Sequence, residues 1–295
     1  MMDMKTHFYS AYAFVLLIAL FSMECSASSK SKTTPLAPPP AFVNPGDAPT
    51  SNPAEYIDKP IEELQKLPLE KRQAIVNIML RWGASGVAPE KTVERMRKAL
   101  VLAPDAIIAH LHIARALNTL KKPEESYQEL QELFKAGNLP LGIYLQAVDL
   151  LFDLGQLDEA EQKAKPLTEG KPPYGEGMHL YAEILQANGK LKESEAMYRK
   201  IITLKTETGA PEFKNPAGAK LRLGEILLKT GRYDEAEKWL LEAADTFRTV
   251  PKPFQRLTEL YIAKKDTQKA RRFLAMFKEK GGDAKVYSDL QKKIG

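Results

Sequence analysis

Apolar residues recur with helical spacing through most of the chain, at positions i, i+3, i+4 and i+7. The pattern is counted from a small residue in each unit, with an apolar side chain four and seven residues after it. Successive small residues lie 34 positions apart, with one interval of 42. They are Thr92, Ser126, Ala160, Ser194, Ala236 and Ala270. This pattern predicts repeated pairs of amphipathic helices.

A short phrase with a glycine and acidic residues separates the two helices of a pair. It reads GQLDEAE at 155–161, GKLKESE at 189–195 and GRYDEAE at 231–237. The glycine favours the left-handed conformation that ends a helix, and acidic residues favour the N-terminus of the next helix. We therefore expect a turn at each glycine, with the small residue buried where the paired helices approach closely.

The stretch LRLGEILLKTGRYDEAEKWLLEA at 221–243 resembles the tetratricopeptide repeat, notably at Leu223, Gly224, Ala236 and Ala243. The resemblance extends over about 71–282, although no unit carries the tryptophan of the family pattern. It implies an all-α fold, a right-handed superhelical solenoid of about six helical hairpins with a capping helix at 283–295. The predicted domain at 56–295 contains units at about 71–104, 105–138, 139–172, 173–206, 215–248 and 249–282.

Two departures from the repeat bear on the ends and the middle of this domain. Eight extra residues fall between Ile201 and Ala217, which predicts a longer loop or longer adjoining helices. A short helix at 60–68 is expected to cover the first unit, as 283–294 covers the last.

The N-terminus has a different composition. Lys5 precedes an apolar run at 11–21, which is too short to span a bilayer and is typical of a signal peptide. We expect a signal peptide at 1–27 with cleavage after Ala27, so that the chain is exported to the periplasm or envelope, or secreted. Alternatively, this segment is retained as an uncleaved signal anchor. Residues 28–55 carry seven prolines and little apolar content, which predicts a disordered linker.

Cys25 is the only cysteine and lies shortly after the apolar run, separated from it by Ser22, Met23 and Glu24. An alternative interpretation is therefore lipidation at Cys25, which would make the chain an outer-membrane accessory or pilot lipoprotein. Glu24 departs from that pattern, since bacterial lipoprotein signals place a small residue before the cysteine.

No motif in the sequence indicates catalysis, a cofactor or a metal. No glycine-rich phosphate loop follows a strand pattern, and no nucleophile motif is present. His110 and His112 are two residues apart, so on a helix they point to different faces, and His179 is isolated. The net charge is +5, but both signs are mixed along the chain, which argues against a nucleic-acid surface. We predict a non-catalytic protein without a cofactor.

The remaining candidate site is a groove that binds a protein or peptide. In the repeats that this chain resembles, the first helix of each pair lines the concave face, so the groove residues follow from the phase. Eleven positions before the small residues are Arg81, Arg115, Asp149, Glu183, Glu225 and Glu259. Apolar side chains flank them at Phe152, Leu221, Leu228 and Ile262. We expect a partner with basic and apolar side chains; alternatively, the four acids form a solvated inner surface.

Overall fold

The computed structural model describes residues 54–82, 88–170, 174–204 and 215–295. All of these residues belong to one compact unit. The predicted signal peptide at 1–27, Cys25 and the linker up to residue 53 lie outside the described residues. The same holds for residues 205–214, which include most of the predicted insertion.

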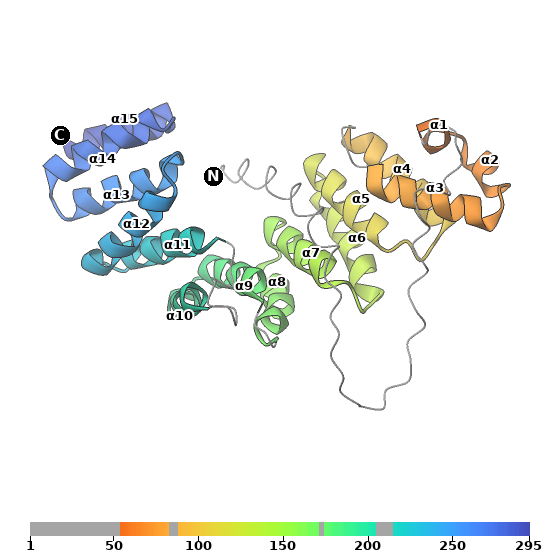
Figure 1. The fold of residues 1–295 in the computed structure, drawn as a ribbon, viewed down its shortest axis with the longest axis horizontal. Coiled ribbons are helices and arrows are strands. Elements are labelled where there is room, and N and C mark those ends of the chain that lie inside the picture. Colours follow the sequence, from red (N-terminus) through yellow and green to blue (C-terminus); the bar gives the residue numbers. More distant parts are fainter. Residues whose placement is uncertain (1–53, 83–87, 171–173, 205–214) are drawn as a thin grey trace. The chain divides into compact units, whose positions relative to one another are not determined.

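The described part of the chain is all-α and contains no strand. Pairs of consecutive helices follow one another (Figure 1), and each helix packs on its neighbours in sequence. The first helices of the pairs are α3 (Leu69–Trp82), α5 (Ile108–Thr119), α7 (Leu141–Asp153), α9 (Gly175–Ala187), α11 (Pro216–Lys229) and α13 (Pro251–Ala263). The second helices are α4 (Pro89–Leu102), α6 (Pro123–Lys135), α8 (Leu157–Ala164), α10 (Leu191–Thr203), α12 (Tyr233–Thr246) and α14 (Thr267–Glu279). The predicted solenoid of helical hairpins is confirmed.

The small residues that set the repeat are buried between paired helices, as expected. Thr92, Ser126, Ala160, Ser194, Ala236 and Ala270 all belong to second helices and all have a relative exposure of 5% or less. The two serines add a polar contact to this packing. Ser126 Oγ and Ser194 Oγ each donate a hydrogen bond, 2.7 Å long, to a carbonyl of the first helix twelve residues earlier. Each buried hydroxyl therefore has its partner.

The turns within the pairs are left-handed at the predicted glycines. Gly155, Gly189 and Gly231 have φ between 76° and 78°. The next N–H donates to the carbonyl five residues earlier, as in Gln156 N to Leu151 O at 3.0 Å, which closes the helix end. Lys121 and Lys265 take the same place with φ of 60° and 59°, although they are not glycines. The sequence analysis did not predict a left-handed residue at these two positions.

Close helix approach explains two further glycines. A Cβ on Gly224 of α11 would lie 2.6 Å from Leu240 side-chain atoms of α12. A Cβ on Gly177 of α9 would lie 2.6 Å from Cβ of Leu167. Gly177, in the stretch YGEGMH at 174–179, therefore allows this close packing because it has no Cβ.

The helical spacing predicted a continuous second helix through Leu167, but α8 ends earlier, at Ala164. A 3-10 turn at Lys165–Thr168 follows it. Pro166 has no N–H and its ring restricts the preceding backbone, so it ends the α-helical hydrogen bonding here. Leu167 is still buried, at 6% exposure.

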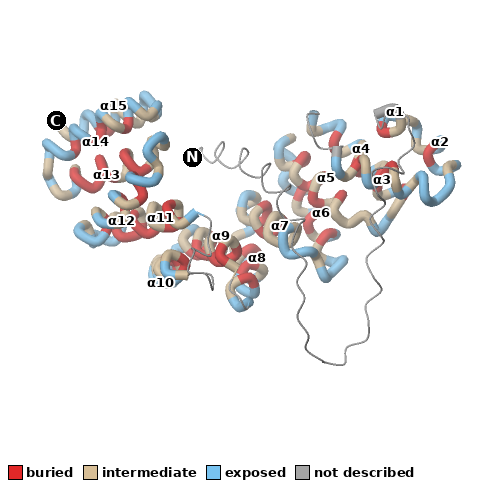
Figure 2. The backbone as a smooth tube through the Cα atoms, in the orientation of Figure 1, coloured by how far each residue is buried: buried red, intermediate tan, exposed pale blue. Residues whose placement is uncertain are grey.

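The core consists of three apolar clusters that follow each other along the chain, and buried residues lie on the facing sides of the helices (Figure 2). The last cluster is covered by α15 (Ala284–Ile294), which contacts α13 and α14 and buries Leu290. The predicted capping helix is therefore present. At the other end, the helix expected at 60–68 is the shorter α2 (Ile61–Gln65), preceded by α1 (Ala54–Ile57).

Candidate binding groove

The predicted groove residues belong to successive first helices. Arg115, Asp149, Glu183, Glu225 and Glu259 lie on α5, α7, α9, α11 and α13, respectively. All five are partly buried. Arg81 is exposed in the last turn of α3. Because the same position recurs on neighbouring helices, these side chains form one series across the first helices.

In the C-terminal half, two arginines alternate with the carboxylates. Arg222 of α11 contacts Glu183 of α9 at 2.8 Å and Glu225 of its own helix at 3.0 Å. Arg256 of α13 contacts Glu225 at 2.7 Å and Glu259 at 2.8 Å. A continuous chain of ion pairs therefore links α9, α11 and α13. The name charged row is used below for the following set of residues: Arg115, Asp149, Glu183, Arg222, Glu225, Arg256 and Glu259.

The arginines hold the central carboxylates in their ionised form. Burial alone would raise the pKa of Glu183, but hydrogen bonds and charges from His179 and Arg222 outweigh it and lower the pKa to about 2. Burial also opposes ionisation of Glu225, and Arg256 and Arg222 together lower its pKa. These acids are thus partners of arginines of the same chain.

Arg222 and Arg256 were not among the site residues predicted from the sequence. Each lies three residues before a carboxylate of the same helix, in RLGE at 222–225 and RLTE at 256–259. An opposite-charge pair at this spacing is a usual helical signal. It could have predicted the pairs within one helix, whereas the contacts between helices depend on the packing.

The N-terminal half of the charged row is arranged differently. Arg115 of α5 donates a hydrogen bond to Gln146 Oε1 of α7 at 2.9 Å. Asp149 forms no hydrogen bond or ion pair with any described residue. Burial, together with the charges of Asp153 and Glu183, raises the pKa of Asp149 to about 7 against the opposing charge of Arg115. Asp149 is therefore a carboxylate without a counter-ion in contact.

Apolar side chains flank the charged row, as the sequence predicted. Leu221, Leu228 and Ile262 are partly buried and pack against the C-terminal cluster, and Phe152 packs in the same way against the middle cluster. Their remaining exposed area, next to charged groups, provides both apolar and polar contacts for a bound segment.

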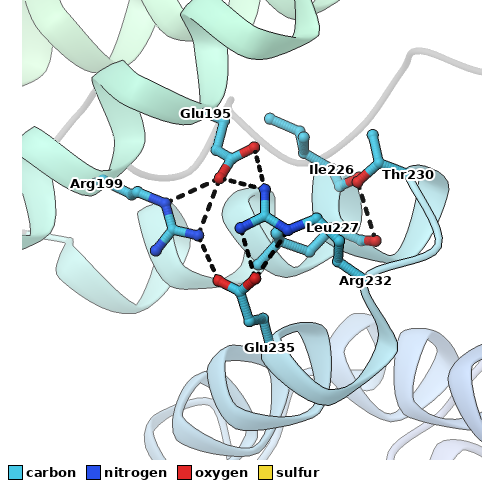
Figure 3. A network of polar contacts seen from close by, with 7 residues as sticks. All are labelled: Glu195, Arg199, Ile226, Leu227, Thr230, Arg232 and Glu235. Carbon is cyan, nitrogen blue, oxygen red and sulfur yellow. Dashed lines mark hydrogen bonds and ion pairs between the residues drawn. The ribbon is translucent and has the colours of Figure 1, made fainter.

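A second ion-pair network lies on other helices and provides a contrast. Glu195 and Arg199 of α10 contact Arg232 and Glu235 at the start of α12 (Figure 3), with Arg199 to Glu235 at 2.7 Å and Arg232 to Glu195 at 2.8 Å. Its two arginines and two glutamates balance each other. Each of the four side chains in this network has a partner of opposite charge.

The histidines in the described part of the chain show no arrangement for metal binding. His110 Nδ1 lies 2.7 Å from Glu129 Oε2 of α6, whereas burial and the charge of Arg115 lower the pKa of His112 to about 4. The two neighbouring histidines therefore face different surroundings. Within the described ranges, no group of three or more His, Cys, Asp and Glu side chains is placed to hold a metal ion. Among the described helices, none has the length and apolar character needed to cross a bilayer.

Comparisons with known proteins agree with this architecture. Two family models described as tetratricopeptide repeat match residues 175–208 and 212–251, which contain α9 with α10 and α11 with α12. The search of curated proteins finds no match.

Several solved structures have a similar fold. One comes from the functional characterization of Pseudomonas aeruginosa pilF. It has 16% sequence identity and a TM-score of 0.58, and the alignment covers 80% of this chain and 100% of that chain. Another is a tetratricopeptide repeat protein from Parabacteroides merdae, with 14% identity, a TM-score of 0.53, and coverage of 79% and 90%. A third is Naa15/Naa10 bound to HypK, with 12% identity, a TM-score of 0.56, and coverage of 79% and 45%.

At identities of 12–16%, the structural similarity supports the fold alone. The family models provide the sequence evidence for the repeats. The buried small residues and left-handed turns recur at the spacing of the family. Together these observations identify tetratricopeptide repeats at 175–208 and 212–251, within a helical solenoid of the same fold.

Proposed function

We propose that this protein is a non-catalytic scaffold that binds a protein or peptide segment along the face formed by α5, α7, α9, α11 and α13. The observation that carries the proposal is the charged row with its apolar flank, which runs over successive first helices. Repeat proteins use such extended faces to bind elongated segments. The partner would contribute apolar side chains to the flank and polar groups to the charged row.

We further propose that the protein acts outside the cytoplasm, as part of an assembly in the cell envelope. This part of the proposal is supported by the N-terminal sequence alone, with Lys5, the apolar run at 11–21 and the proline-rich stretch that follows. Cell fractionation with intact-mass analysis tests it. A chain that begins at Ser28 supports an exported scaffold without a lipid anchor. A mass increase from acyl chains on Cys25 would support the outer-membrane accessory or pilot lipoprotein instead.

The arginines change how the binding face is best tested. Reversing Glu183, Glu225 and Glu259 to lysine would confront Arg222 and Arg256 with like charges, and the loss of folding would obscure binding. Changes in the apolar flank avoid this problem. Leu228→Gln combined with Ile262→Gln reduces the apolar contact area and leaves the ion pairs in place.

The experiment uses the full tagged chain, crosslinked in the cells that produce it, with partners identified by mass spectrometry. A partner that is recovered with the parent and lost with the double variant supports the proposed face. The matched control is Leu241→Gln on α12, a leucine that is 40% exposed and belongs to a second helix. A partner retained by the double variant but lost by the control would overturn the proposal. Circular dichroism establishes that both variants remain helical.

A further inference from the structure

The charged row follows a rule of contact between helices. Positions are again counted back from the small residue of each unit. The residue at eleven positions back in one unit contacts the residue at fourteen positions back in the next unit. Glu183 meets Arg222 in this way at 2.8 Å, and Glu225 meets Arg256 at 2.7 Å. The same geometry places Gln146 against Arg115 at 2.9 Å. Neighbouring first helices therefore join through one polar pair at each of these steps.

The step from α7 to α9 is the exception. Asp149 occupies the first position of the pair, but Leu180 stands where the next units have an arginine. Leu180 is buried at 5% exposure and belongs to the core. As a result Asp149 has no contacting cation, although it is placed like the paired carboxylates Glu183 and Glu225.

The charges around Asp149 leave an excess of negative charge. Asp153 on its own helix and Glu183 on α9 both oppose its ionisation, and Arg115 on α5 favours it. Arg115 is already hydrogen-bonded to Gln146, and Glu183 is already paired with Arg222 and close to His179 at 3.5 Å. Among the described residues, Arg115 is thus near Asp149, but no cation is in contact with its carboxylate.

We propose that a lysine or arginine side chain of the bound segment occupies the place beside Asp149, between α7 and α9, where the charged row lacks an arginine. This inference rests on the proposed function, because it assigns one contact within the proposed binding face. At the following steps the cation comes from this chain itself, as Arg222 and Arg256. Beside Asp149 the bound partner would supply it.

The surroundings fit a long cationic side chain. Asp149 is only partly buried, so part of this residue is accessible to solvent. Phe152 lies three residues further along α7, on the same side of the helix, and is only partly buried. An alkyl stem can pack on such an apolar surface while its charged end reaches the carboxylate. An acidic side chain would instead meet the carboxylate of Asp149, so this place discriminates by charge.

The contact also makes binding depend on pH. The pKa of free Asp149 is raised to about 7 by burial and by the neighbouring carboxylates. A bound cation stabilises the ionised form and lowers that pKa, so affinity increases as the pH rises. Between pH 6 and pH 8 the ionised fraction of a group with this pKa rises about tenfold, which sets the expected gain in affinity.

The test uses random peptides displayed on phage, selected on the full-length immobilised chain at pH 8. Selected peptides are then synthesised and titrated against the parent, the Asp149→Asn variant, and the Leu228→Gln and Ile262→Gln double variant. Asp158→Asn serves as the control, since Asp158 is an exposed carboxylate in the first turn of α8. The side chain of asparagine has nearly the size of aspartate, so the fold is expected to tolerate the change.

The expected result is a shared lysine or arginine in the peptides, with about tenfold weaker binding to Asp149→Asn and unchanged binding to Asp158→Asn. Replacing that basic residue of the peptide by glutamine should weaken binding equally, and combining both changes should add nothing further. The pH dependence should disappear in Asp149→Asn. His179 is unchanged in that variant. Any pH dependence of binding that remains in Asp149→Asn therefore comes from a group other than Asp149.

Two results would overturn the proposals separately. Peptides that lose affinity in the apolar double variant but not in Asp149→Asn, or that share no basic residue, overturn the cation site and leave the binding face standing. Peptides that bind both Asp149→Asn and the apolar double variant as tightly as the parent overturn the proposed binding face and the cation site with it.

Discussion

The two halves of the charged row share one packing frame but differ in how their charges are balanced. From α9 to α13, each carboxylate contacts an arginine, and the pairs cross from helix to helix. From α5 to α9, Arg115 contacts a neutral glutamine and Asp149 contacts no cation. The small residues are equally buried in both halves. Electrostatics, and not the backbone arrangement, therefore distinguishes the compensated half, α9 to α13, from the open half, α5 to α9, where Asp149 has no contacting cation among the described residues.

The largest expected effect comes from removing an arginine of the compensated half. Arg222→Ala would leave Glu183 and Glu225 without a contact that both use, and these side chains are only 14% and 8% exposed. Mostly buried charges that lose a partner are costly, so we expect a loss of about 2–4 kcal/mol in the free energy of unfolding, measured with urea.

Arg115→Ala is the matched change in the open half. It removes a hydrogen bond to a neutral amide, and we expect a loss of about 1 kcal/mol or less. Equal losses for the two variants would show that the halves do not differ in the way described.

The shared packing frame can be tested in both halves by the same enlargement. Ala236→Leu on α12 and Ala160→Leu on α8 both introduce bulk at residues that are 0% exposed. Overpacking of such a site costs about 1–3 kcal/mol. Thermal unfolding should show similar losses for the two variants, since both positions serve the same close helix approach. A large loss at one site and none at the other would mean that the frame is not shared.

The open half should become more stable when Asp149 loses its charge. The folded-state pKa of about 7 lies above the unfolded value of 3.8, so the folded state holds a proton that the unfolded state releases. Stability therefore falls as pH rises from about 4 to about 7. Asp149→Asn removes this titration, and we expect a gain of about 1–2 kcal/mol at pH 8, after allowing for relaxation and partial exposure.

Unfolding curves measured between pH 4 and pH 8 check the sign of this effect. The gain from Asp149→Asn should grow through that range and then level off. In the compensated half, Glu183 has its pKa lowered to about 2, so its contribution should be lost only as the pH falls from about 4 towards 2. A gain that shrinks as pH rises would contradict the assignment.

The smallest effect concerns the turns, where each half carries one lysine in a left-handed conformation. Lys121 precedes α6 and Lys265 precedes α14, with φ of 60° and 59°. Glycine adopts this conformation without the penalty of a Cβ. Lys121→Gly and Lys265→Gly should each raise the free energy of unfolding by about 0.5–1 kcal/mol, measured by chemical denaturation. A loss in either variant would show that the lysine side chain stabilises its turn by more than the backbone penalty.

Much of the fold could be predicted from the sequence because the determining contacts repeat at a fixed spacing. Gly155, Gly189 and Gly231 mark turns through a backbone preference, which acts within a few residues. Ala160 and Ala236 mark helix approaches, because each packs on the helix that directly precedes it. Such local rules can be recognised in a sequence by counting. Lys121 and Lys265 were missed because lysine carries no preference for the left-handed conformation that the turn requires.

The candidate site was predicted only in part, for the same physical reason. Counting eleven residues back placed Asp149, Glu183, Glu225 and Glu259 on the first helices, but their charges alone indicated one acidic ladder. The partners that neutralise them come from the next unit: Arg222 lies 39 residues from Glu183, and Arg256 lies 31 residues from Glu225. The sequence by itself determined which helix face carries the charges. Only the tertiary structure decided which of them are paired, because helix packing sets which distant side chains come within contact and leaves Leu180 where Asp149 would need an arginine.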